Sequence, residues 1–162
     1  MGGGIWWGAV GLQGDLVGTV RWSAVDFWEY NEHNIDGKGR LVLPSSFRES
    51  FEDGGVMTFM GSRVVIFEPA VWESRLRKMG ASGNFTNREI DFVKSFVTVF
   101  TPDAQNRVTI PARLRERAGL EREVALIGMG DHIDVYDRAV WKSLEDEMAA
   151  ATDLSDRLAE AL

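Results

Sequence analysis

The chain contains no cysteine and only two histidines, His33 and His132, in 162 residues. The lack of cysteine excludes a disulfide framework, a thiol nucleophile and a cysteine-based zinc site. The two histidines do not form an HExxH-type pair, so a histidine-built metal centre is not expected. We therefore expect neither a metal nor a cofactor.

Long hydrophobic runs are also missing. No stretch reaches the roughly 18 consecutive apolar residues of a membrane-spanning helix. The apolar start, residues 1–18, lacks the basic region of a signal peptide and is interrupted by Gln13 and Asp15. The sequence therefore predicts a cytoplasmic protein with no membrane partner. Apolar residues still make up 44% of the chain, which excludes a mostly disordered protein.

Basic residues are fewer than acidic ones. Lys and Arg number 18 against 25 Asp and Glu, so the formal net charge is −7. This balance argues mildly against a nucleic-acid partner, but the charge is unevenly distributed. More than half of the negative excess lies in residues 142–162, which hold six acidic and two basic residues. The middle of the chain is therefore less acidic than the whole.

One sequence pattern occurs twice, at a constant offset of 67 residues. The matches continue at an offset of 69 residues and end at Trp72 and Trp141. The chain therefore contains two copies of one structural unit. The repeated segments are Asp36-Gly-Lys-Gly-Arg40-Leu-Val-Leu-Pro44-Ser-Ser-Phe-Arg48 and Asp103-Ala-Gln-Asn-Arg107-Val-Thr-Ile-Pro111-Ala-Arg-Leu-Arg115.

Each copy predicts a β-hairpin, a short helix, a second hairpin and a second helix. Gly39 and Asn106 tolerate the positive φ that a tight turn requires. A unit of about 45 residues seldom folds alone, so the copies are expected to bury each other's faces. Strands are expected at residues 27–30, 41–43, 56–60, 64–67, 96–100, 108–110, 124–127 and 133–136. Helices are expected at residues 44–51 and 111–118 and around Trp72 and Trp141.

The predicted organisation has five parts. Residues 1–24 form a Gly-rich extension, which we expect to be disordered or a mis-assigned start, and dispensable. Units 27–74 and 96–141 are joined by a linker, 75–95, that contains a short helix at 87–94. Residues 142–162 form an acidic amphipathic helix that covers a core edge or, alternatively, binds a partner.

The repeated Asp-x-x-x-Arg allows two interpretations. In the first, aspartate and arginine pair across the turn and only stabilise it. In the second, the arginine contacts nucleic acid, because its guanidinium fork reads guanine and binds phosphate. The second interpretation is favoured by the basic surroundings: segment 107–117 holds four arginines and one glutamate, and Lys38 and Arg48 accompany the first motif.

The two motifs, each followed by an apolar hairpin and a tryptophan, resemble the MraZ family of bacterial transcription regulators, which are built from two AbrB-like (SpoVT-AbrB) units. The resemblance spans residues 25–141. It implies a mainly β fold with peripheral helices (α+β), an AbrB/MazE/MraZ-like swapped-hairpin double-split β-barrel formed by the two tandem repeats. It also maps the family's DNA-contacting motif onto this chain. With the neighbouring lysine, the candidate DNA-binding residues are Asp36, Lys38, Arg40, Asp103 and Arg107.

The resemblance further implies a homo-oligomeric ring of more than two subunits that binds double-stranded DNA. The implied target is G-rich repeats upstream of the chain's own operon in the division and cell-wall gene cluster, with repression as the expected outcome and the nucleoid as the location. An AbrB/MazE-type antitoxin that binds DNA and a toxin is the alternative. The family's helix at this place is usually richer in Arg and Phe; in this chain the segment keeps Arg88, Phe92 and the nearby Phe96.

An enzyme is the third class considered. The chain has no phosphate loop, GxSxG motif or dinucleotide-binding fingerprint. Asp36 and Asp103 lie beside arginines, which keep a carboxylate ionised and unsuited to act as a general acid. We therefore expect no catalytic residue and no small-molecule substrate. Trp72 and Trp141 are expected as core anchors rather than as stacking platforms for nucleobases.

Overall fold

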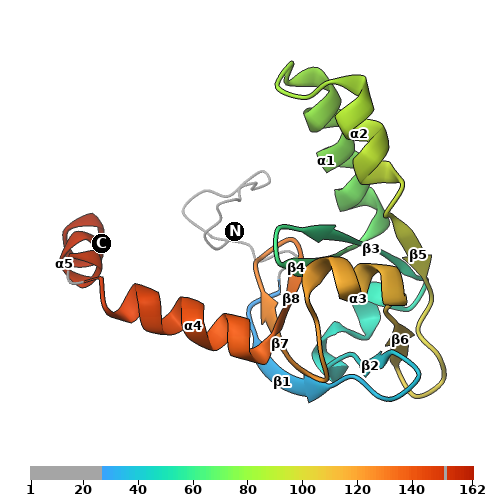
Figure 1. Cartoon of the computed structure of the whole chain (residues 1–162), viewed down its shortest axis with the longest axis horizontal. Helices are drawn as coiled ribbons and strands as arrows, with labels where there is room; N and C mark the ends of the chain where they lie inside the picture. The colour runs from blue at the N-terminus through green and yellow to red at the C-terminus, as the bar shows by residue number, and fades with distance from the viewer. Residues whose placement is uncertain (1–26, 152) are drawn as a thin grey trace, which may run out of the picture.

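The computed structural model describes residues 27–151 and 153–162 (Figure 1). The extension expected at residues 1–24 lies outside this described part. The strands are β1 (Tyr30–Asn34), β2 (Arg40–Val42), β3 (Gly55–Met60), β4 (Arg63–Phe67), β5 (Thr98–Phe100), β6 (Arg107–Thr109), β7 (Glu123–Gly128) and β8 (Ile133–Asp137). The helices are α1 (Pro69–Ala81), α2 (Asn87–Lys94), α3 (Ala112–Ala118), α4 (Arg138–Ala149) and α5 (Leu154–Ala161), with 3-10 turns η2 (Ser45–Phe47) and η3 (Glu49–Phe51).

The two repeats exchange strands. Six strands form one antiparallel sheet in the order β1-β7-β8-β4-β3-β5. The first strand of each repeat thus pairs with the second hairpin of the other repeat: β1 with β7, and β5 with β3. When each strand is replaced by its counterpart in the other repeat, the result is the same order read from the opposite edge of the sheet. The swapped-hairpin, mainly β fold with peripheral helices that the sequence predicts is confirmed.

Strands β2 and β6 form a separate two-stranded antiparallel pair, which we call the ribbon. Leu41 pairs with Val108 at its centre, and both side chains are almost fully buried, at 0% and 2% exposure. They join the main hydrophobic core together with sheet residues such as Ile66 and Val135. The core therefore lies between the ribbon and the sheet, and burial of the apolar residues of both layers holds the ribbon in place.

The first strand of each repeat begins later than the sequence predicts. Phe27 forms only an isolated bridge with Gly130, and β1 starts at Tyr30 instead of 27. In the second repeat, the N–H groups of Phe96 and Val97 bond to the end of α2, at Val93 and Lys94, so β5 starts at Thr98 instead of 96. Hydrogen bonds to neighbouring elements therefore set both starting points.

The helix expected at residues 44–51 is wrong in type, because the structure has the two 3-10 turns η2 and η3 there. Its counterpart α3 is a true α-helix that ends at Gly119, whose φ is 68°. The difference follows from composition. The first copy places Ser45 and Ser46 where the second has Ala112 and Arg113, and serine has the lower helix propensity.

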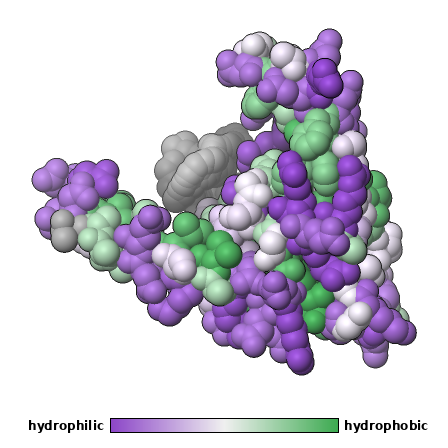
Figure 2. All heavy atoms as spheres, in the orientation of Figure 1, coloured by the Kyte–Doolittle hydropathy of each residue, from purple (hydrophilic) through white to green (hydrophobic). Residues whose placement is uncertain are grey.

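The C-terminal segment forms two helices rather than the single helix expected. Helix α4 ends at Ala149, with Ala150 as its C-cap, and α5 begins at Leu154, with Asp153 as its N-cap. Aspartate is unfavourable in a helix interior, which favours a break here; the Asp153 carboxylate makes no capping hydrogen bond and pairs with Arg157 at 3.0 Å. Helices α4 and α5 extend from one side of the body, and the α1–α2 pair extends from another (Figure 1). Hydrophilic residues cover most of the face in Figure 2. Within the described residues, no helix is long and apolar enough to cross a membrane.

Candidate nucleic-acid interface

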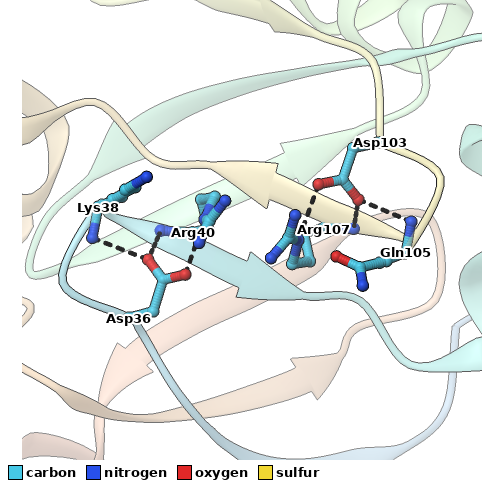
Figure 3. Close-up of polar contacts among 6 residues, drawn as sticks. All are labelled: Asp36, Lys38, Arg40, Asp103, Gln105 and Arg107. Atoms are coloured by element: carbon cyan, nitrogen blue, oxygen red, sulfur yellow. Dashed lines mark hydrogen bonds and ion pairs between the residues drawn. The ribbon is translucent and has the colours of Figure 1, made fainter.

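The turn before β2, residues 36–40, is held by the carboxylate of Asp36 and is called turn 1. One oxygen, Oδ1, accepts hydrogen bonds from the backbone N–H groups of Lys38 and Arg40, each at 2.9 Å. The other, Oδ2, accepts from the side-chain Nε of Arg40 at 2.7 Å (Figure 3). The same aspartate therefore shapes the turn and fixes the arginine side chain.

The turn before β6, residues 103–107, repeats this geometry and is called turn 2. Asp103 Oδ1 accepts from the N–H groups of Gln105 and Arg107 at 2.9 Å, and Oδ2 accepts from Arg107 Nε at 2.7 Å (Figure 3). Gly39 and Asn106 have positive φ values of 79° and 59°, as expected for these positions. The aspartate and the arginine of each motif therefore pair across the turn, as the first interpretation of the motif requires and the second allows.

Both aspartates are held in the ionised form. The backbone N–H of Arg40 is the main cause that lowers the pKa of Asp36 to about 2, and the Arg40 side chain adds to it. The backbone N–H of Arg107 likewise lowers the pKa of Asp103, with further support from the Arg107 side chain. Each carboxylate is therefore a permanent acceptor at neutral pH and cannot serve as a general acid.

The two arginines lie on one face of the ribbon. In the antiparallel register, Arg40 is opposite Thr109, and Val42 is opposite Arg107. Because side chains alternate along a strand, these four share a face, while Leu41 and Val108 point to the core. Val42 and Thr109 are exposed, and Arg40 and Arg107 retain 30% and 27% of their side-chain exposure. The ribbon thus presents two diagonally placed arginines to solvent.

Each arginine keeps its terminal edge available. The side-chain hydrogen bond of Arg40 to Asp36, and that of Arg107 to Asp103, is made by Nε. In the part of the chain that the structure describes, no hydrogen bond is made by the terminal nitrogens, Nη1 and Nη2, of either arginine. A guanidinium fixed at Nε and unpaired at its end can donate a fork of hydrogen bonds to an external acceptor.

Different side chains donate hydrogen bonds to the backbone carbonyls at the two ends of the ribbon. Asn106 Nδ2 donates to the carbonyl of Leu43 at 2.8 Å. At the corresponding place in turn 1 there is a glycine, and Arg115 Nε donates to the carbonyl of Ile110 at 3.0 Å. A Cβ on Gly39 would lie 3.0 Å from Nη2 of Arg115. The matched arginines of the sequence pattern are therefore not equivalent: Arg115 supports turn 1, whereas Arg48 is exposed.

The arginines of α3 do not all contribute to a positive surface beside the ribbon. The guanidinium of Arg113 lies 3.7 Å from the ring centroid of Phe96, and its Nη1 donates to the carbonyl of Ser95. Arg117 lies over Phe59 at 4.9 Å and over Phe92 at 5.5 Å. These cation–π contacts join α3 to α2 and β3. The basic segment predicted from the sequence is thus divided between the ribbon and an aromatic cluster.

Trp72, Trp141 and His33 lie outside the ribbon, on α1, α4 and β1. Trp72 is 6% exposed and packs beside Phe67, which confirms its role as a core anchor. Trp141 is half-buried and packs against Tyr136 at 5.2 Å. His33 is half-buried on β1; burial is the main cause that lowers its pKa, followed by the charge of Arg138.

A charged cluster at the seam between the repeats was not predicted from the sequence. His132 Nδ1 lies 2.8 Å from Asp131 Oδ1, and His132 Nε2 lies 3.4 Å from Asp134 Oδ1. Arg75 on α1 donates two bonds to Asp131, at 2.7 and 2.8 Å, and Arg63 on β4 pairs with the buried Asp134 at 3.0 Å. The adjacent Asp131 and His132 were the available signal. Among the described residues, no group of three or more acidic, histidine or cysteine side chains could hold a metal ion.

Comparison with known proteins identifies similar sequences along most of the chain. The profile of a family described as "MraZ protein, putative antitoxin-like" matches residues 27–94 and 98–162. The transcriptional regulator MraZ of Kineococcus radiotolerans is 38% identical over 132 residues, which cover 79% of this chain and 91% of that protein. The transcriptional regulator MraZ of Acetivibrio thermocellus is 33% identical over 142 residues, covering 82% of this chain and 96% of that protein. The transcriptional regulator MraZ of Clavibacter michiganensis is 37% identical over 111 residues, which cover 66% of this chain and 78% of that protein.

Proposed function

The chain belongs to the MraZ family, and on that premise we propose that it is a transcriptional regulator that binds double-stranded DNA through the exposed face of the ribbon. One observation carries the proposal. Arg40 and Arg107 lie on the same solvent-facing side of a two-stranded ribbon, each fixed by an aspartate. The relatives are named transcriptional regulators, which is not an enzyme class, and this argues against an enzymatic role.

The dimensions of the DNA major groove support this function. The groove is about 12 Å wide and admits a two-stranded β-ribbon. Arginine paired with O6 and N7 of guanine is the commonest specific contact in this groove. Asp36 and Asp103 position the two guanidinium groups before DNA arrives, which lowers the entropic cost of binding. Pairing within the turn and DNA reading are therefore complementary roles of one motif.

The target and the assembly form the finer part of the proposal. The chain acts as a homo-oligomer of more than two subunits, since one ribbon offers only two motif arginines and an acidic protein needs several such contacts. It binds G-rich repeats upstream of its own operon in the division and cell-wall gene cluster, where it represses transcription and associates with the nucleoid. Lys38, at the tip of turn 1, adds a phosphate contact.

An antitoxin is the second candidate, favoured by the words "antitoxin-like" in the family description. Antitoxins of the AbrB/MazE type usually pair one DNA-binding motif with an extended tail that binds the toxin. Here the motif is duplicated, and residues 138–149 and 154–161 are helical. These features favour the regulator.

A gel-shift titration with the DNA immediately upstream of the chain's own gene tests the function. Wild-type protein is compared with Arg40→Ala, Arg107→Ala and the matched control Arg77→Ala, which removes an exposed arginine of α1. We expect the ribbon variants to lose most specific binding, since each bidentate base contact is worth about 1–3 kcal/mol of discrimination. Melting temperatures should change little for all three. Unchanged affinity of both ribbon variants would contradict DNA reading by this motif, and their unfolding would favour a purely structural turn.

A further inference from the structure

The two turns at the ends of the ribbon have the same backbone geometry but carry different exposed side chains. The bonds that hold Lys38 and Arg40 to Asp36 have the same lengths as those that hold Gln105 and Arg107 to Asp103, 2.9 and 2.7 Å. Lys38 and Gln105 are therefore equivalent positions in two superposable turns. Both residues are exposed. Because β2 and β6 are antiparallel, the two turns lie at opposite ends of the ribbon.

Lysine and glutamine interact with DNA differently. The ammonium of Lys38 is a point charge with three donors and no acceptor, so it suits a phosphate group. The amide of Gln105 has both a donor and an acceptor, which match N7 and N6 of adenine in the major groove. A phosphate contact positions a protein on the duplex, whereas a base-edge contact depends on sequence.

The surroundings increase this difference. Turn 1 contains Lys38 and Arg40, and the side chain of Arg115 lies beside its Gly39. In turn 2, Asn106 occupies the place of Gly39, and its neutral amide bonds to Leu43. Turn 1 therefore has Lys38, Arg40 and Arg115 around the single carboxylate of Asp36, whereas turn 2 has Arg107 paired with Asp103 and the exposed neutral amide of Gln105.

We propose that the ribbon binds DNA in one direction only, with Lys38 anchoring one end on a phosphate and Gln105 reading a base edge at the other. This inference rests on the proposed function. The two arginines, related by the pseudo-twofold symmetry of the repeats, give the same contact in either direction. Lys38 and Gln105 break that symmetry and make Gln105 a specificity-determining residue.

Directional binding is measured with a tethered cleavage reagent, because the chain has no cysteine and one introduced cysteine is unique. Gly37→Cys and Ala104→Cys place the reagent on equivalent residues of the two turns. A Cβ at Gly37 meets nothing within 4 Å, and Ala104 is exposed, so both variants should fold. Each protein carries an iron-EDTA group on its cysteine and is bound to the end-labelled DNA immediately upstream of the gene.

We expect the reagent at residue 37 to cut on one side of each protected sequence and the reagent at residue 104 to cut on the other. Cutting on both sides from each position would overturn the inference while leaving the proposed function intact. If no sequence is protected by the wild-type chain, the proposed function fails, and this inference fails with it.

Substitutions of Lys38 and Gln105 test whether the lysine contacts a phosphate and the glutamine reads a base. Lys38→Gln should lower the slope of the logarithm of affinity against the logarithm of salt concentration by about 1 and leave base preference unchanged. Gln105→Ala should keep the salt slope and reduce selectivity at one base pair roughly tenfold. The double exchange Lys38→Gln/Gln105→Lys should move the cut from residue 37 to the opposite side. A cutting pattern that is unchanged by the double exchange would show that other residues set the direction.

Discussion

The side-chain amide of Asn106 donates a hydrogen bond of 2.8 Å to the carbonyl oxygen of Leu43, a residue of the other repeat. The backbone N–H of Leu43 in turn donates to the carbonyl of Asn106 at 2.9 Å. Asn106 therefore combines a turn conformation with φ of 59° and a buried link between the repeats. It does more than replace the glycine found in turn 1.

The first prediction concerns this link. Asn106→Gly keeps the φ value accessible but leaves the Leu43 carbonyl without its side-chain donor, at a cost of about 1–3 kcal/mol. Asn106→Ala loses the same bond and adds about 1–2 kcal/mol of left-handed strain. In urea denaturation we expect wild type to be the most stable, Asn106→Gly to be less stable and Asn106→Ala to be the least stable. An alanine variant as stable as the glycine variant would contradict the strain argument.

The second prediction concerns acid stability of the turns. The pKa of Asp36 is lowered to about 2 and that of Asp103 is also lowered, so their stabilisation is complete above the ordinary value of 3.8. It is lost as the pH falls through the folded-state pKa values. The double variant Asp36→Asn/Asp103→Asn should be less stable than wild type at pH 5, and the difference should shrink towards pH 2.

Melting temperatures measured between pH 5 and pH 2 check the turn prediction, with Asp53→Asn as a control at an exposed carboxylate outside both turns. The control should follow the wild-type profile. The double variant should also bind DNA more weakly, because its arginines are less firmly oriented. A constant stability difference across this pH range would show that the aspartates do not act through their charge.

Much of the fold could be predicted because both copies of the repeat indicate the same series of elements. Short apolar runs on either side of glycine-containing turns predicted the hairpins at 56–67 and 124–136 nearly as observed, β3–β4 and β7–β8. The sequence could not give the start of β1, which depends on the bridge from Phe27 to Gly130. Nor could it show that Arg113 and Arg117 lie on aromatic rings of other elements, since local charge counts ignore tertiary contacts.

The third prediction concerns assembly. Large hydrophobic side chains are exposed on several elements, among them Phe92 at 48%, Val99 at 75%, Met148 at 51% and Leu158 at 52%. Hydrophobic residues are visible over α4 and over the α1–α2 pair in Figure 2. We expect a homo-oligomer of more than two subunits, because association removes such surface from water. Light scattering at micromolar concentration measures this, and a mass near the 18.1 kDa of one chain would contradict it.

The fourth prediction concerns His132 at the seam between the repeats. Burial lowers the pKa of His132, but the carboxylates of Asp131 and Asp134 outweigh burial, and the net shift is upward from 6.5. Arg75 and Arg63, which pair with these carboxylates, also belong to the cluster, and the ring of Phe67 lies beside the imidazole at 5.5 Å. Both ring nitrogens face acceptors, so the doubly protonated imidazolium fits the site.

A histidine with a raised pKa contributes stability that is fully present below the unfolded-state value of about 6.5. This contribution is lost as the pH rises through the higher folded-state pKa. The melting temperature of wild-type protein should therefore fall with rising pH above 6.5, and that fall should be reduced in His132→Gln. His33→Gln is the matched control, because the pKa of His33 is lowered and its removal should leave the fall unchanged.

NMR titration of the two imidazoles measures their pKa values directly, and the His33→Gln spectrum assigns the two signals. His132 should titrate above 6.5 and His33 below it. A His132 that titrates below 6.5 would mean that burial outweighs the two carboxylates and that the cluster holds a neutral imidazole.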